Sequence, residues 1–424
     1  MEKEIKRFDM KESPRDLKWY LKPVVGLLTN PAWKKHQPKI TYINTENIKG
    51  PFVLLCNHNA FLDFKIAIKL LGKNKSNFVV AIDGYIKREQ LLRNVGAICK
   101  RKFTNDVVLI RHLKKVIDKG NVAVIYPEAR YSLCGTTAVL PESLGKLVKF
   151  LNVPVVTLIC HGHHVNSPFW DSSHDRNVKP IEATYKLLLD KEQVKEKSVD
   201  EINKMIVDDF QYDDFAWQKE RNIEINDKNR AKGLHRVLYQ CPNCLKEYQM
   251  DSFGINLVCN NCHSKWEMTP LGELQVIEGK ERFRHIPDWY EWQRANVRQE
   301  IKENRYSSGV LDVTIDSLPN AKGFIHLGKG TLVHDMNGFK LNGLDINGKP
   351  FELVKEVASL YSCHIEYQYL FKYGDCIDLN TIEDTYYIYP QGNNFNVTKM
   401  ALATEELYFD MLEKQGKKVK PGLA

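Results

Sequence analysis

Short apolar runs alternate with amphipathic stretches between residues 39 and 190. The apolar runs are continuous, as in strands that are buried on both faces. The stretches between them place apolar residues three and four positions apart, which is typical of helices with one buried face. This alternation predicts an α/β domain with a mainly parallel sheet flanked by helices. The expected strands are 52–56, 78–82, 122–126 and 153–160, and the expected helices include 62–71, 106–119 and 142–151.

The pattern changes after residue 309. Short segments there alternate apolar and polar residues between turns rich in Gly and Asn, which indicates antiparallel strands. A stretch with helical spacing, 397–413, follows the last of them. Several short strands closed by one terminal helix resemble a pleckstrin-homology-like barrel. We therefore expect a β-rich domain over 309–415, separate from the α/β domain over 39–190.

The N-terminal segment 1–38 combines charge with a short apolar centre. Residues 1–16 are densely charged and lack the apolar core of a secretory signal. Pro23 and Gly26 are expected to divide the following stretch into two short amphipathic helices with aromatic residues at their ends. Such helices can lie in a membrane interface or pack on the next domain, and both interpretations stay open. No run approaches the ~18 apolar residues of a membrane span, so we expect a cytoplasmic protein.

Positive charge is concentrated in one part of the chain. The formal net charge is +8, but residues 65–119 alone hold 14 Lys or Arg against 4 Asp or Glu. A basic field of this kind attracts phosphorylated substrates, acidic lipid headgroups or nucleic acid. A solvated helical face would give the same pattern, so the charge alone does not select among these partners.

Four of the ten cysteines form two Cys-x-x-Cys pairs separated by fourteen residues. In a reducing compartment such pairs are metal ligands in preference to disulfides. Cys241, Cys244, Cys259 and Cys262 predict a zinc ribbon with one structural zinc per chain, because four thiolates close the tetrahedron and leave no open position. The segments expected around it are a helical connector over 191–236, the ribbon over 237–270 and a second connector over 271–308.

A histidine and an aspartate follow the first expected strand. Asn57 and His58 stand at its carboxyl end, the edge where open α/β sheets place ligands, and Asp63 stands near the start of the next helix. A carboxylate on one imidazole nitrogen fixes the tautomer and leaves the other nitrogen to accept a proton. Taken alone, the pair also fits a helix-capping Asp and a His bonded to the backbone.

Together with three further motifs, this pair resembles the glycerolipid acyltransferase family, which includes 1-acylglycerol-3-phosphate acyltransferases. The motifs occur in the family's order within the first 190 residues. The family's Asn-His-x₄-Asp block is similar to residues 57–63, and its Gly-to-Arg strand is similar to 96–101. Its aromatic-Pro-Glu block is similar to 126–132, and its apolar strand with an early Pro is similar to 153–156.

The resemblance implies a mechanism and a set of substrates. His58 is then the general base, oriented by Asp63, for transfer of a fatty acyl group from acyl-CoA or acyl carrier protein to the hydroxyl of a lysophospholipid. Arg101, Glu128 and Arg130 are then acceptor- and phosphate-binding residues. The third block departs from the family, because its arginine stands one residue early, so the acceptor can differ from lysophosphatidate. Since such acceptors are membrane lipids, we expect peripheral attachment to the anionic inner face of the cell membrane.

The histidines His161, His163, His164 and His174 cluster after the fourth motif. A second metal site would use such residues, but we favour loop and acceptor-pocket histidines.

Two other classes of function are compatible with the sequence. A zinc-ribbon protein could bind nucleic acid, but Lys246 and Lys265 are the only cations between residues 241 and 267, so we expect no nucleic-acid partner. A thioesterase or hydrolase on the same scaffold is the second alternative. The absence of a G-x-S-x-G motif disfavours a serine hydrolase, whereas a His-Asp pair that activates water is not excluded by the sequence.

Overall fold

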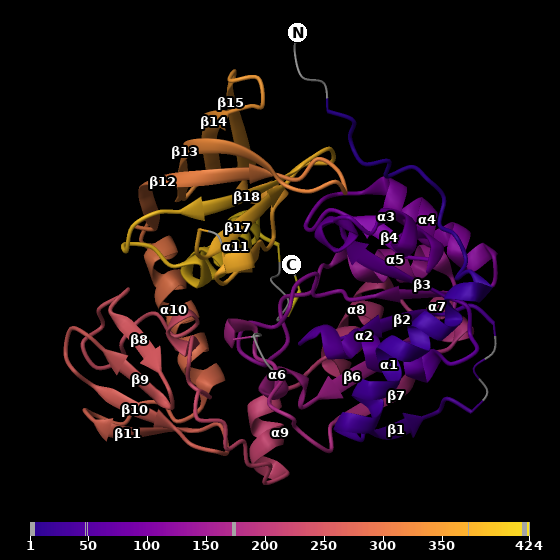
Figure 1. Cartoon of the computed structure of the whole chain (residues 1–424), viewed down its shortest axis with the longest axis horizontal. Helices are drawn as coiled ribbons and strands as arrows, with labels where there is room; N and C mark the ends of the chain where they lie inside the picture. The colour runs from indigo at the N-terminus through magenta and orange to yellow at the C-terminus, as the bar shows by residue number, and fades with distance from the viewer. Residues whose placement is uncertain are drawn as a thin grey trace.

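The computed structural model describes residues 5–46, 48, 50–171, 175–371, 373–417 and 422–423, so His174 lies outside the described residues. Three β-sheets and their helices lie next to one another (Figure 1). The sheet formed by the first half of the chain stands on one side of the molecule. A small sheet and a larger antiparallel sheet stand on the other side, with the long helix α10 between them.

The first sheet carries seven strands in the order β1-β7-β6-β2-β5-β3-β4. Strands β6 and β7 pair antiparallel, and the other neighbouring pairs are parallel. The mainly parallel sheet flanked by helices is confirmed. The pattern of apolar runs did not predict three of its strands, because β1 is largely exposed, β4 has three residues, and β7 alternates. Of these, β4 lies within the Gly-to-Arg motif at 96–101. The strands are β1 (Lys39–Ile43), β2 (Val53–Cys56), β3 (Ser76–Ala81), β4 (Ile98–Lys100), β5 (Val122–Ile125), β6 (Val155–His161) and β7 (Glu182–Leu189).

Helices cover the sheet through apolar stripes. In α4, Leu113, Val116 and Ile117 are buried, and the Asp106 side chain caps the first turn by accepting from the Leu109 amide at 3.0 Å. The helices of this part are α1 (Lys22–His36), α2 (Phe61–Leu71), α3 (Glu89–Asn94), α4 (Val107–Asp118), α5 (Ser143–Leu151), α6 (His163–Asn166), α7 (Lys191–Glu196), α8 (Val199–Asp209) and α9 (Asp214–Glu220).

The N-terminal segment differs from its prediction. A short 3₁₀ turn, Trp19–Leu21, leads into the single continuous helix α1, so Pro23 and Gly26 do not break it. Pro23 lies in the first turn, where a backbone N–H has no partner within the helix and its loss costs little. None of the helices in the described ranges combines the length and apolar character needed to cross a bilayer.

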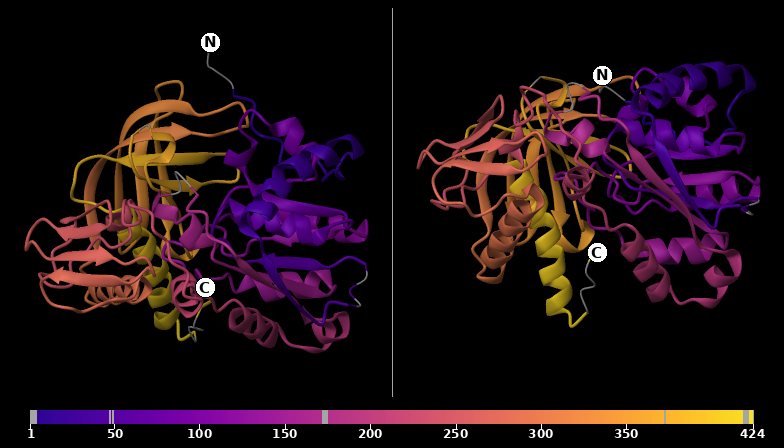
Figure 2. Two further views of the ribbon diagram at one scale, coloured as in Figure 1. Left: turned by 60° about the horizontal axis from the view of Figure 1, so that its bottom comes forward. Right: turned by 90° about the horizontal axis from the view of Figure 1, so that it is seen from below.

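The C-terminal half is rich in β-structure, as predicted. Its small sheet is antiparallel in the order β11-β10-β9-β8, and its large sheet is antiparallel in the order β15-β14-β13-β12-β18-β17-β16. Helices α10 (Ile286–Lys302) and α11 (Val397–Lys414) lie side by side (Figure 2). The strands are β8 (Met250–Phe253), β9 (Asn256–Cys259), β10 (Lys265–Met268), β11 (Leu274–Glu278), β12 (Ser307–Ser317), β13 (Ile325–Asp335), β14 (Gly338–Leu344), β15 (Pro350–Glu356), β16 (His364–Glu366), β17 (Cys376–Asn380) and β18 (Thr385–Pro390).

Buried ion pairs connect the two halves of the molecule. Arg130 donates to Glu405 of α11 at 2.7 Å, and the other carboxylate oxygen of Glu405 accepts from Arg294 of α10, also at 2.7 Å. Arg130 and Glu405 are buried, which makes this contact far more sensitive to the loss of one partner than a surface ion pair.

Replacement of Glu405 by Gln should therefore destabilise the protein strongly. The change leaves two buried guanidinium groups without their shared carboxylate, and we expect a loss of about 3–5 kcal/mol in the free energy of unfolding. Urea denaturation measures this loss. The matched control is Asp208→Asn, which breaks an exposed ion pair with Lys204 and should cost under about 1 kcal/mol. Equal effects of the two changes would contradict a buried clamp.

Candidate active site

His58 and Asp63 are brought together by the tight turn from β2 into α2. The Asp63 side chain caps its own helix, because its Oδ2 accepts from the amides of Asn59 at 2.6 Å and Ala60 at 2.9 Å. The same oxygen lies 3.2 Å from Nδ1 of His58. Asp63 is fully buried, whereas the His58 side chain is 22% exposed. With Nδ1 on the carboxylate, Nε2 is the ring nitrogen of His58 that is left for a substrate.

A second imidazole contacts the other oxygen of the same carboxylate. Nδ1 of His163, at the start of α6, lies 2.5 Å from Oδ1 of Asp63. Burial alone would raise the pKa of Asp63, but the hydrogen bonds from His163 and His58 outweigh it and lower this pKa to about 2. Sequence reasoning missed this contact. The adjacency of β2 and β6 could have pointed to it, because parallel neighbours end at the same edge.

Glu128 supports the turn that carries His58. Its carboxyl group accepts from the His58 amide at 2.9 Å and from the Ala138 amide at 2.8 Å. Burial raises the pKa of Glu128 to about 8, although these hydrogen bonds oppose the shift. The side chain does not border the cavity described below. Glu128 thus holds the backbone of the site, while its predicted contact with an acceptor stays a prediction.

Two tyrosines of the third motif enclose the His58 ring. The ring centroids of Tyr126 and Tyr131 each lie 4.3 Å from that of His58. These contacts leave the imidazole little rotational freedom, so its Nδ1 stays directed at Asp63.

Arg101 and Arg130 both contact the C-terminal half of the chain. Arg130 forms the Glu405 ion pair, yet it borders the cavity, and among the described residues its Nε and Nη1 have no hydrogen-bond partner. Arg101 is 1% exposed and does not border the cavity. Its two terminal nitrogens donate to four acceptors of the C-terminal half, which are the carbonyls of Leu318, Pro319 and Glu383 and the hydroxyl of Thr385.

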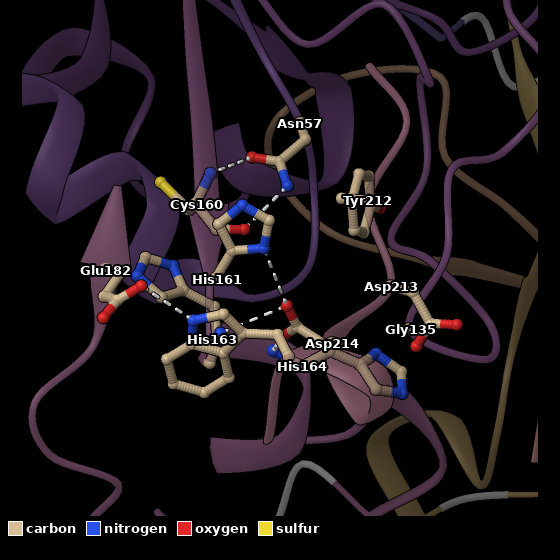
Figure 3. A network of polar contacts seen from close by, with 12 residues as sticks. Asn57, Gly135, Cys160, His161, His163, His164, Glu182, Tyr212, Asp213 and Asp214 are labelled. Atoms are coloured by element: carbon tan, nitrogen blue, oxygen red, sulfur yellow. Dashed lines mark hydrogen bonds and ion pairs between the residues drawn. The ribbon is translucent and has the colours of Figure 1, made fainter. Parts of the chain in front are cut away.

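The remaining histidines of the cluster have separate partners. Figure 3 shows Asp214 among His161, His163 and His164. Asp214 accepts from the amides of Gly162 at 3.1 Å and His164 at 2.7 Å, and burial raises its pKa to about 7. The His164 ring packs against Trp170 and Phe215. Nδ1 of His161 lies 3.8 Å from Asp214, so the three described rings do not share one ligand position. A different set, Asp63, Cys160 and His163, has potential ligand atoms within 4.8 Å of one another.

A cavity of about 1840 Å³ is lined by His58 and by residues of both halves of the chain. It exceeds the 300–1,000 Å³ of ordinary ligand pockets. Its polar lining includes Lys102 together with His364 and Glu366 of β16. Its lining also includes apolar side chains that are exposed to solvent, namely Trp19, Val24, Leu28, Phe61, Leu91, Val107, Ile110 and Phe150.

Two comparisons relate part of the chain to known proteins. Residues 39–161 match the family model described as Acyltransferase. No curated protein matches the sequence. Among solved structures, the fold is similar to that of the 1-acyl-sn-glycerophosphate (LPA) acyltransferase PlsC from Thermotoga maritima, with 15% identity and a TM-score of 0.33 over 45% of this chain and 80% of that chain.

The four paired cysteines converge outside residues 39–161. The Sγ atoms of Cys241 and Cys262 are 3.6 Å apart, those of Cys244 and Cys259 are 3.7 Å apart, and all four lie within 4.8 Å of one another. Four thiolates at about 2.3 Å from a zinc ion form a tetrahedron with edges of about 3.8 Å. The four cysteines therefore fit one structural zinc ion.

We predict that the purified protein contains one zinc ion per chain. Elemental analysis of protein prepared without added metal measures this, and Cys241→Ser should release the ion because three thiolates hold it far more weakly. Cys99→Ser is the control, since Cys99 lies on β4, remote from the cluster, and its change should leave the metal content intact. A metal-free parent protein, or one that contains iron, would contradict the assignment.

Proposed function

We propose that the protein is an O-acyltransferase that moves a fatty acyl group from an acyl thioester to the hydroxyl of a lysophospholipid such as 1-acylglycerol 3-phosphate. The observation that carries the proposal is the His58–Asp63 pair at the wall of a large apolar cavity, in a domain that matches the Acyltransferase family. The donor is acyl-CoA or acyl carrier protein.

Each step follows from the two side chains. Nε2 of His58 takes the proton of the acceptor hydroxyl as its oxygen attacks the thioester carbonyl carbon. The tetrahedral intermediate then expels the thiolate, which receives the proton from the imidazolium. The buried, ionised Asp63 stabilises that imidazolium while it exists. General-base catalysis of this kind contributes about 10²–10⁴ in rate.

The contacts of Arg101 and Arg130 indicate which of the two is the better candidate for binding a phosphate group. We propose Arg130 for this role, because it borders the cavity and its Nε and Nη1 have no described partner. Arg101 would first have to exchange four protein acceptors. The acceptor headgroup then lies near the polar side chains of the cavity wall, to which the C-terminal half contributes His364 and Glu366.

The exposed apolar rim of the cavity supports a membrane-bound substrate. We propose that the protein is cytoplasmic and attaches peripherally to the anionic inner face of the membrane, with α1 against the lipid. The exposed Trp19 and Leu28 of this region are 79% and 42% accessible and border the cavity, so an acyl chain could pass from the bilayer to His58 without crossing water.

The C-terminal region is proposed to be a pleckstrin-homology-like barrel. Strands β12 to β15 and β16 to β18 form two antiparallel meanders that meet where β12 pairs with β18, and α11 follows the last strand. This arrangement supports the proposal made from the sequence.

The product of the reaction tests the proposed function. Purified protein should convert labelled acyl thioester and a lysophospholipid into a diacyl lipid, which mass spectrometry identifies against a panel of lysolipid headgroups. His58→Ala should reduce turnover by about 10²–10⁴ without unfolding the protein, and Asp63→Asn should be impaired because an amide does not stabilise imidazolium. Release of free fatty acid alone would instead indicate a thioesterase, and a folded His58→Ala protein with normal turnover would remove His58 from the chemistry.

Vesicle co-sedimentation tests the attachment to membranes. Binding to anionic vesicles should weaken with salt, since each nearby Lys or Arg contributes about 1 kcal/mol, but apolar contacts should preserve a remainder. Replacement of Trp19 and Leu28 by Ala should remove that remainder. The control replaces Val310 and Ile382, two exposed apolar residues of the β-rich region, and should leave binding unchanged. A protein that ignores anionic vesicles at low salt would refute the peripheral model.

A further inference from the structure

The contact between His163 and Asp63 has no part in the steps described above. Nevertheless, it is among the shortest contacts of the site, at 2.5 Å between Nδ1 and Oδ1. We propose that His163 is a positioning residue of the acyl-transfer reaction, which keeps Asp63 ionised and fixes the plane of its carboxylate from the side opposite His58. The inference rests on the proposed function, because Asp63 matters to turnover only if His58 is the general base.

The two oxygens of Asp63 are bonded in different ways. Oδ2 accepts from the amides of Asn59 and Ala60 and lies against the ring of His58. For Oδ1, His163 is the hydrogen-bond donor that the described residues provide. Asp63 and His163 are both fully buried, so no bulk water can replace the donor. Without His163, a charged oxygen would be left buried and unsatisfied.

The local fold holds the His163 ring in this place. Gly162 precedes it with φ +86°, and a Cβ there would lie 2.7 Å from the Trp217 ring. The amides of Gly162 and His164, on either side of His163, both donate to Asp214 (Figure 3). Nε2 of His163 has no partner among the described residues. The ring is therefore fixed by its backbone, and the described contacts direct its hydrogen bonding to Asp63.

The effect of His163 on the pH dependence has a definite sign. A donor on Oδ1 stabilises the anionic form of the His58–Asp63 pair, and burial opposes that form. Loss of the donor must raise the proton affinity of the pair, so the acid limb of the rate profile should move to higher pH. The other titratable groups that face Asp63 are Cys56 of β2, Tyr126 and Tyr131 after β5, Cys160 of β6, His164 of α6, and Tyr212 and Asp214 at α9.

Most of these groups are neutral throughout the useful pH range. Burial raises the pKa of the Cys56 and Cys160 thiols and of the tyrosines, and it lowers the pKa of His164 to about 3. Asp214 is the exception, with a pKa of about 7. His163 lowers the pKa of Asp214, so the loss of His163 would shift this group as well. The profiles are therefore compared in an Asp214→Asn background, where a difference reports on the His58–Asp63 pair.

Substitution of His163 tests the proposal through kinetics. His163→Ala should lower kcat roughly 10- to 100-fold, the worth of a charge-assisted hydrogen bond. The KM values should change little because His163 does not border the cavity, and the acid limb should move to higher pH. His163→Asn places an amide N–H near the position of Nδ1 and should restore part of kcat. His164→Asn is the matched control: His164 is equally buried, is not bonded to Asp63, and its change should leave the acid limb in place.

A measurement that does not depend on turnover separates the inference from the proposed function. In protein labelled with ¹⁵N-histidine, the Nδ1 protons of His58 and His163 should resonate at low field, and Asp63→Asn should displace both signals. His163→Ala should remove one signal and shift the other. If these signals behave so but the parent transfers no acyl group, the proposed function fails while the link between His163 and Asp63 stands.

Three results would overturn the inference. The first is a His163→Ala protein whose kcat stays within about threefold of the parent. The second is a loss of turnover with an unmoved acid limb and no rescue by Asn, which would indicate a purely structural role. The third is a His58 signal that does not respond to the loss of His163.

Discussion

The carboxylate of Asp63 is fully buried and is stabilised by donors from two segments of the chain. Two backbone amides come from the turn after β2, one imidazole comes from the same turn, and the second imidazole comes from α6 beyond β6. An isolated buried carboxylate would take up a proton. The pKa of this one is instead lowered, so the role proposed for His58 depends on the sheet order that sets β2 beside β6.

The pKa of Glu128, a second buried carboxyl group, is shifted in the opposite direction. It also lies at the carboxyl edge of the sheet and is also buried, but the groups around it are two amides and a tyrosine hydroxyl, and burial prevails. The pKa values of two carboxyl groups of one site are thus shifted in opposite directions. In the proposed reaction Asp63 stabilises the imidazolium that forms during turnover, whereas Glu128 supports the backbone of His58.

Much of this arrangement could be predicted from the sequence, and the failures have physical causes. The apolar runs of β2, β5 and β6 predicted the central strands, and the spacing of the motifs predicted that His58 and Asp63 meet. The predicted break of the N-terminal helix at Pro23 and Gly26 was wrong, because a proline in the first turn of a helix is tolerated. His163 and the partners of Arg101 depend on contacts across 100 residues or more. The local sequence pattern does not show which residues so far apart in the chain lie together. For His163, the order of the strands in the sheet could have supplied that information.

The Arg130–Glu405 contact also has a consequence for the synthesis of the protein. Arg130 leaves the ribosome 275 residues before its partner does. At a translation rate of about 5–20 residues per second, Glu405 is added roughly 14–55 s after Arg130. During this interval the nascent N-terminal half has every residue of the His58 turn but lacks β16 and α11, which complete the cavity wall and the ion pair. The wall of the cavity is therefore complete only after α11 has been translated.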